Sequence, residues 1–83
     1  MKGTIYEINH NRSMVAVRTE EGDFSIFELI SGDIVEVGDE VQWQNDTGLG
    51  SEILNNLTRR NRYEVYFQNH HVLEPQLRQQ LLY

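Results

Sequence analysis

The sequence predicts an all-β fold: a small closed barrel of five short strands, followed by a C-terminal extension that contains a short helix. Two observations lead to this prediction. Short stretches rich in β-branched and aromatic residues recur at close intervals along residues 1–58, and turns containing Gly, Asn or Asp separate them. Five strands at such spacing are typical of a small barrel, and 83 residues leave room for a single core.

The first three predicted strands form a meander with short connections. Residues 4–9, 14–18 and 24–30 have the apolar content and partial alternation that are typical of strands. The polar residues 10–13 form the first turn. Gly22 supplies the positive φ that a tight second turn requires.

The last two predicted strands follow a break in the meander at residues 31–33. The chain then crosses to the fourth strand, residues 40–44, which alternates strictly and carries Trp43 as an expected core residue. Residues 46–50 form a flexible hairpin loop, and residues 51–58 form the fifth strand.

The C-terminal extension, residues 59–83, differs in composition from the barrel. Residues 59–62 are basic, and residues 63–67 have the composition of a possible extra strand. Pro75 suits the first turn of a helix, because its missing N–H would be unpaired there in any case. The predicted organisation is therefore a barrel at 1–58 with the basic segment, the possible strand and the short helix packed on it.

Three leucines of this extension lie on one helical stripe. Leu73, Leu77 and Leu81 are spaced four residues apart, so they fall on the same face. A helix of two turns is not stable alone, so the stripe must pack against another surface. Two candidates follow: the open end of the barrel itself, or a second copy of the chain, which would make a homodimer.

Composition and charge narrow the function classes. The net charge of −6 divides into −7 in residues 1–50 (three cations, ten acids) and +1 in residues 51–83 (four cations, three acids). Such a chain repels a phosphate backbone except at a local basic patch. The sequence has no apolar run long enough to cross a membrane, no cationic-then-apolar start that would predict a signal peptide, and no cysteine. We therefore expect a cytoplasmic protein without membrane contact, disulfides or thiolate metal sites.

Three segments match turn and core positions of one known family. Residues 1–5 (Met-Lys-Gly-Thr-Ile) resemble its opening Met-x-Gly-x-Val, and residues 35–43 resemble its Leu-x-x-Gly-Gln-x-Val-x-Phe. Residues 55–58 resemble its closing Gly-Asn-Val-Thr. This family is the cold-shock domain, a five-stranded OB-type barrel that binds single-stranded RNA or DNA. The resemblance covers residues 1–58 and implies an OB-type barrel here.

The departures from that family fall where its members stack bases. The rings of the family's binding positions are replaced by short, aliphatic or acidic side chains at Glu7, Met14, Ala16, Ser25 and Glu28. Each stacked base is worth about 1–3 kcal/mol. Losing five rings therefore removes at least about 5 of the roughly 8 kcal/mol that a micromolar complex requires. We expect these positions to form a solvent-facing wall that no longer stacks bases.

Two groups of residues remain candidates for nucleic-acid contact. The first group is Tyr6, Phe27 and Arg12. Tyr6 and Phe27 align with family positions that face outward, and Arg12 keeps the positive charge of the Lys at its position in the family. For both rings the alternative is partial burial. The second is the only basic cluster with an adjacent aromatic residue, formed by Arg59, Arg60, Arg62 and Tyr63. For this cluster the alternative is pairing with the acid-rich first half.

Neither a catalytic nor a metal-binding pattern is present in the sequence. His70 and His71 are adjacent, so on a strand they face opposite ways and cannot chelate one ion together. The sequence indicates no third ligand near them, and it contains no recognisable Ser-His-Asp set and no Gly-rich phosphate loop. We expect no enzyme activity, no metal and no cofactor.

The predicted function is that of a non-enzymatic binding module. The resemblance implies weak binding of single-stranded RNA or DNA, through a non-standard surface centred on residues 59–62. The alternative is a protein-interaction module. The predicted sheet face is mixed apolar and acidic, which suits a basic or amphipathic protein segment, and the stripe of Leu73, Leu77 and Leu81 offers a homodimer.

Overall fold

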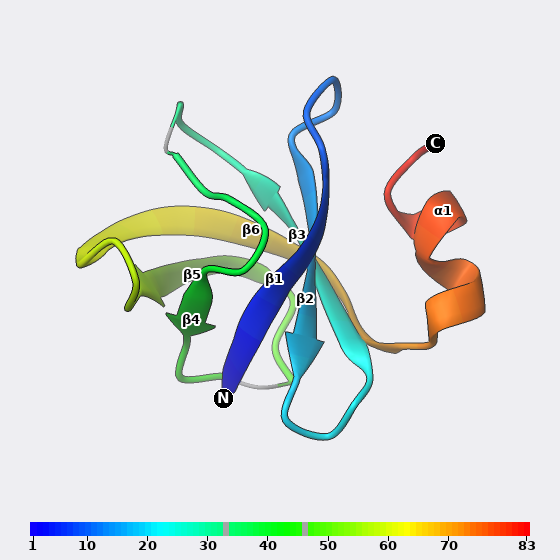
Figure 1. Ribbon diagram of the computed structural model, residues 1–83, viewed down its shortest axis with the longest axis horizontal. Coiled ribbons are helices and arrows are strands. Elements are labelled where there is room, and N and C mark those ends of the chain that lie inside the picture. Colours follow the sequence, from blue (N-terminus) through cyan, green and yellow to red (C-terminus); the bar gives the residue numbers. More distant parts are fainter. Residues whose placement is uncertain (33, 46) are drawn as a thin grey trace.

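Six antiparallel strands form a closed barrel with a short helix after it, in a computed structural model that describes residues 1–32, 34–45 and 47–83 (Figure 1). The strands are β1 (Lys2–Asn9), β2 (Met14–Thr19), β3 (Phe24–Leu29), β4 (Glu40–Gln42), β5 (Gly50–Asn56) and β6 (Asn61–Val72), and the 3-10 turn η1 (Glu74–Gln76) and helix α1 (Leu77–Gln80) follow. The predicted all-β barrel with a C-terminal helix is confirmed, with six strands instead of five. Asp33 and Asp46, which the sequence places in a break and in a loop, lie outside the described residues.

The strands are arranged as two three-stranded meanders, β1-β2-β3 and β4-β5-β6, and their order around the barrel is β1-β2-β3-β6-β5-β4. On one side β1 pairs with β4, where Lys2 lies opposite Gln42. On the other side β3 pairs with β6, where Phe27 lies opposite Phe67. Each described strand therefore has two neighbours, although the short β4 pairs only with the last two residues of β5, Asn55 and Asn56.

The sixth strand comes from the C-terminal extension. β6 alternates between buried and exposed residues from Tyr63 to Phe67, in agreement with the strand composition of that segment, and it continues to Val72. The inward side chains of Tyr63, Val65 and Phe67 complete the barrel interior. Because β6 lies between β3 and β5, the barrel extends to Val72, well beyond residue 58.

All six strands contribute apolar side chains to the barrel interior. The predicted core position of Trp43 is confirmed: it is 1% exposed, and its ring lies 5.1 Å from that of Phe67. Phe67 in turn contacts Phe27, with ring centroids 5.6 Å apart. The other buried members are Ile5, Val15, Val17, Val35, Val41, Leu54, Tyr63 and Val65. The interior is a packed core, which leaves the outer surface for any ligand.

A second apolar core lies outside the barrel, between the outer face of β2 and β3 and the helix α1, which Figure 1 shows beside these strands. Its buried members are Met14, Ala16, Phe24, Ile26, Val72, Leu77 and Leu81. The prediction that the leucine stripe packs on another surface is therefore confirmed for Leu77 and Leu81 but not for Leu73, which is exposed. Of the two candidate surfaces, the open end of the barrel is wrong, because Leu77 and Leu81 pack on the outer face of β2 and β3 of their own chain.

Polar contacts anchor the C-terminal segment to β1. The side-chain amide of Asn9 donates a hydrogen bond to the backbone oxygen of Leu81 at 2.7 Å, and the hydroxyl of Tyr83 donates to the backbone oxygen of Ile8 at 3.1 Å. The bond from Asn9 satisfies the carbonyl of Leu81 at the end of α1, where the last carbonyls lack an intrahelical partner. Among the described residues, no helix has the length and apolar content needed to cross a membrane.

The docked helix also limits what a homodimer through the leucine stripe would use. Leu77 and Leu81 are buried within the chain, whereas Leu73 is 61% exposed. Only Leu73 of the three predicted contact residues is therefore accessible to a second copy while α1 stays docked.

Candidate functional site

The seven residues that the sequence singles out for nucleic-acid contact do not form one surface. They are Tyr6 on β1, Arg12 in the β1–β2 turn, Phe27 on β3, Arg59 and Arg60 in the β5–β6 turn, and Arg62 and Tyr63 on β6. Phe27 is 0% exposed and Tyr63 is 6% exposed, so no base can stack on either ring. Of the three aromatic candidates, only Tyr6 has an accessible face.

The expectation that Phe27 points outward is wrong, because β3 faces the opposite way. Phe27 lies opposite Val15, and both side chains belong to the barrel core. Ile26 lies opposite Ala16, and both belong to the second core outside the barrel. Residues 24–27 carry bulky apolar side chains at three of four positions, so alternation alone does not decide which side faces inward.

The predicted solvent-facing wall of Glu7, Met14, Ala16, Ser25 and Glu28 is therefore not open to solvent. Met14 and Ala16 point away from the barrel interior, but α1 covers them. Ser25 is buried as well, and only Glu7 and Glu28 are partly exposed. The face that the cold-shock resemblance assigns to base stacking is occupied by the chain's own C-terminal segment.

Arg59 is engaged in ion pairs with the acid-rich first half. Its guanidinium donates to Asp39 at 2.8 Å and lies 2.8 Å from the carboxylate of Glu36. The hydrogen bond to Asp39 raises the pKa of Arg59. Burial raises the pKa of Asp39, but hydrogen bonds from Asn56, from a backbone amide and from Arg59 outweigh it and hold this pKa below its usual value. Arg59 therefore serves the fold and is not free for a phosphate.

Arg12, Arg60 and Arg62 are exposed, and within the described parts of the chain none of them forms an ion pair. Arg12 lines a polar groove of about 690 Å³ beside α1. The other lining residues are Asn11, Ser13, Met14, Glu28, Gln68, Gln79, Gln80 and Leu82. Because Glu28 balances Arg12, this groove has no excess of positive charge for a phosphate backbone.

Tyr6 is accessible but engaged with the docked segment. It is 39% exposed, its ring centroid lies 4.9 Å from that of Phe24, and its hydroxyl donates to the carboxylate of Glu74 at 3.1 Å. The hydrogen bond to Glu74 and the negative charge of that carboxylate raise the pKa of Tyr6. The ring thus closes the edge of the second core.

A buried Ser–His pair, which the sequence did not indicate, joins three segments. His70 Nδ1 lies 2.8 Å from Ser25 Oγ, and His70 Nε2 lies 2.8 Å from the backbone oxygen of Gly48. Since a carbonyl only accepts, Nε2 carries a proton, and in the neutral ring Nδ1 then accepts from the serine hydroxyl. Ser25 is 2% exposed, and neither residue lines the polar groove. The arrangement holds β3, β6 and the β4–β5 connection together and offers no substrate access to the hydroxyl.

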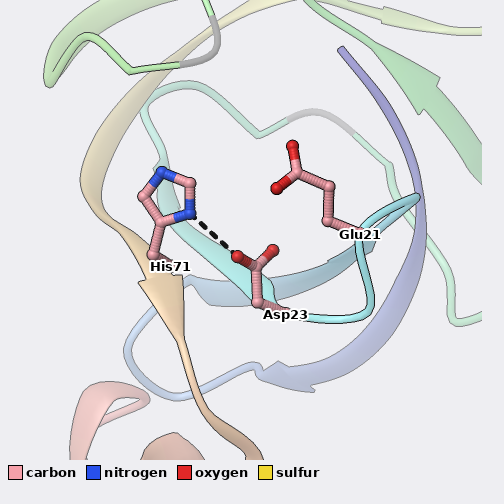
Figure 2. A group of neighbouring side chains, drawn as sticks. All are labelled: Glu21, Asp23 and His71. Carbon is pink, nitrogen blue, oxygen red and sulfur yellow. Dashed lines mark hydrogen bonds and ion pairs between the residues drawn. The ribbon is translucent and has the colours of Figure 1, made fainter.

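His71 points the other way, toward two carboxylates of the β2–β3 turn (Figure 2). Its Nδ1 lies 2.8 Å from an oxygen of Asp23, and the ligand atoms of Glu21, Asp23 and His71 all lie within 4.8 Å of one another. Burial raises the pKa of Asp23, but hydrogen bonds from Thr19 and His71 outweigh it and lower this pKa. The opposite orientations of His70 and His71 are as predicted. The convergence of His71 with Glu21 and Asp23 was not predicted, because 48 residues separate Asp23 from His71 in the sequence.

Exposed aliphatic residues lie on the connection between β3 and β4, which runs through the upper left of Figure 1. Ile30, Ile34 and Val37, here called the crossover patch, are 53%, 64% and 63% exposed. Ile34 also lines a hollow of about 300 Å³, whose other lining residues are Ile8, His10, Leu29, Val35 and Glu36. All three of these aliphatic side chains are therefore more than half accessible to solvent.

Comparison with models of known protein families, with characterised proteins and with solved structures found no match to this chain. The resemblance of residues 1–58 to a cold-shock domain therefore stays a prediction.

Proposed function

We propose that the protein is a non-enzymatic module that binds another protein through the crossover patch. The observation that carries the proposal is the exposure of Ile30, Ile34 and Val37 on one connection beside an apolar hollow. The absence of enzyme activity is proposed because the buried Ser25–His70 pair lines neither the polar groove nor this hollow.

The energetics of the patch suit an anchor for a partner. Burying a whole aliphatic side chain contributes about 1.5–3 kcal/mol, so completing the burial of each half-exposed one contributes about 1 kcal/mol. A micromolar complex requires about 8 kcal/mol in total. The patch thus supplies part of the affinity, and polar contacts around it must supply the rest.

The charge of the surface indicates a basic, amphipathic partner segment. Residues 1–50, which contain the crossover patch, carry ten acids against three cations. Glu36 stands beside the hollow with its side chain 68% exposed, although it also pairs with Arg59. An apolar side chain flanked by Lys or Arg matches this combination of an aliphatic patch and a negative field.

Weak single-stranded nucleic-acid binding is the second candidate, favoured by the exposure of Arg60 and Arg62 next to the β5–β6 turn. Two cations yield at most two phosphate contacts, and a salt slope of about −1.4 on a single strand follows. With Phe27 and Tyr63 buried and Arg59 paired, stacking and further charge contacts are not available there.

Affinity capture from cell extract with surface variants tests the protein-binding proposal. We expect Ile30→Ser/Ile34→Ser to lose partners that the wild type retains. The matched control is Leu49→Ser, because Leu49 is also 64% exposed but lies on the β4–β5 connection at the other end of the barrel. A retained partner is then purified and titrated calorimetrically, where the double variant should bind at least about tenfold more weakly.

The same variants separate the two candidates. A partner lost equally by Leu49→Ser would count against the crossover patch, and the absence of any partner that distinguishes the variants would remove the proposal. Titration with labelled single-stranded oligonucleotides at 50 and 200 mM salt forms the second arm. Submicromolar binding at the higher salt that is lost in Arg60→Ala/Arg62→Ala would favour nucleic acid instead.

A further inference from the structure

Three potential metal ligands converge between the β2–β3 turn and the end of β6 (Figure 2). Glu21 and Asp23 come from the turn, and His71 comes from the last but one residue of β6. Their ligand atoms all lie within 4.8 Å of one another. The three side chains point toward a common space on the outer surface, where solvent has access to Glu21 and His71.

The fold holds two of these ligands in place before any ion binds. The pairing of Phe24 with Val72 brings the start of β3 beside the end of β6, so Asp23 and His71 are neighbours. The hydroxyl of Thr19 donates to one oxygen of Asp23, which leaves the other oxygen facing Nδ1 of His71 at 2.8 Å. A hydrogen bond such as the one from Thr19 is a typical outer-sphere support for a metal-ligating carboxylate.

The chemistry of the ligand set favours a divalent first-row metal such as zinc. Two carboxylates supply two negative charges, and among the described residues no Lys or Arg forms an ion pair with Glu21 or Asp23. An imidazole nitrogen with two carboxylate oxygens suits zinc better than calcium or magnesium, which prefer oxygen ligands only. Three protein ligands also leave a coordination position for water or for a group from a partner.

We propose that Glu21, Asp23 and His71 form a binding site for a divalent metal ion of the zinc type. Bonds of about 2.0–2.2 Å in a tetrahedral arrangement place ligand atoms about 3.4 Å apart. The Asp23–His71 pair needs little movement to reach this separation, and Glu21 reaches it by rotation of its exposed side chain. The site is independent of the crossover patch, because it shares no residue with it.

A metal ion at this position would tie the β2–β3 turn to the strand that leads directly into the docked C-terminal segment. His71 precedes Val72, which belongs to the second core with Leu77 and Leu81. Because the ion binds the folded chain and not the dispersed ligands of the unfolded chain, it raises the midpoint of thermal unfolding.

Calorimetric titration of metal-free protein with zinc chloride at pH 7.5 tests the site. We expect one zinc per chain with a dissociation constant of about 10–100 µM, weaker than four-ligand structural sites. At 0.5 mM zinc the Tm should rise by about 5–10 °C. In an amide NMR spectrum the largest shifts should fall on residues 19–23 and 70–72.

Two variants within the cluster and two control variants outside it show whether the zinc binds at this site. His71→Asn should weaken zinc binding at least tenfold and keep the fold, because Asn tolerates the backbone φ of +56° at this position. Glu21→Gln should weaken it severalfold at an exposed position that does not disturb packing. His10→Ala and Glu20→Gln, exposed residues outside the cluster, should leave the affinity unchanged. A wild-type dissociation constant above 1 mM, or an unchanged affinity in folded His71→Asn and Glu21→Gln, would overturn the proposal, as would calcium binding more tightly than zinc.

Discussion

The two meanders of the barrel present opposite kinds of outer face. On β2 and β3, the apolar residues that point away from the interior are Met14, Ala16, Phe24 and Ile26, and all four are buried in the second core with Leu77 and Leu81. On β5 and β6, the paired outward residues are Ser51 with Tyr66, Ile53 with Glu64, and Asn55 with Arg62. Within the described part of the chain, no helix lies on this second face, and it is mostly exposed.

The difference shows why the C-terminal segment belongs to the fold. A strand with one apolar side needs only one apolar surface to pack against. For β6 this surface is the barrel interior, where Tyr63, Val65 and Phe67 are buried. β2 is apolar on both sides, so it needs a second cover outside the barrel. α1 provides that cover, and by doing so it removes from solvent the face that the cold-shock resemblance assigns to base stacking.

Truncating the two leucines by which α1 covers β2 and β3 should have the largest effect on the free energy of unfolding. Each fully buried Leu→Ala change costs about 2–5 kcal/mol, so Leu77→Ala/Leu81→Ala should lower the free energy of unfolding by about 4 kcal/mol or more, close to the whole stability of a small domain. Urea titration followed by Trp43 fluorescence measures this. The exposed pair Leu73→Ala/Leu82→Ala is the control and should lose less than about 1 kcal/mol. Equal midpoints for the two variants would show that the covered face does not need α1.

Breaking the buried Ser25–His70 link should have the next largest effect. His70→Ala leaves the hydroxyl of Ser25 and the carbonyl of Gly48 without this partner, and unmet buried polar groups cost about 1–3 kcal/mol. The loss is read from the same urea titration. His10→Ala, at an exposed position, should change the midpoint little, and a His70→Ala midpoint equal to that of the control would mean that the link is dispensable.

A fall in pH should weaken the interaction of Asp39 with Arg59, which joins the acid-rich residues 1–50 to the β5–β6 turn. The pKa of Asp39 is lower in the folded chain than its ordinary value of about 3.9, so its contribution to stability is full above that value and is lost as the pH falls through the lowered pKa. Asp39→Asn removes this group. We expect the free energy of unfolding of the variant to fall less steeply than that of the wild type between pH 4 and pH 2, and parallel curves would contradict the role of Asp39.

The smallest effect on the free energy of unfolding is expected from a change on the outer face of β5 and β6, which α1 does not cover. Ile53→Ala removes a side chain that is 48% exposed and should change the free energy of unfolding by about 0.5 kcal/mol or less. Its matched partner on the covered face is Ile26→Ala, where the side chain is 0% exposed and the loss should be about 2–5 kcal/mol. A similar loss for both isoleucines in urea titrations would remove the distinction between the two faces.

The functional surfaces were harder to predict than the fold. Of the seven residues singled out from the sequence, two aromatic ones are buried and Arg59 is paired with Asp39. Local patterns do not reveal these outcomes, because Arg59 meets Asp39 across 20 residues and His71 meets Asp23 across 48. The crossover patch carries a local signal, three aliphatic residues on a connection, but only the exposure values separate it from core.

The sequence by itself determined the all-β barrel, the positive φ of Gly22, the burial of Trp43 and the stripe that includes Leu77 and Leu81, because each depends on alternation or turn chemistry within a few residues. Only the tertiary structure decided that β6 closes the barrel, that Phe27 faces inward and that the stripe covers the outside of β2 and β3. These choices depend on which apolar surfaces meet. When a strand is apolar on both sides, as β2 is, only its partners in space decide which side faces the interior.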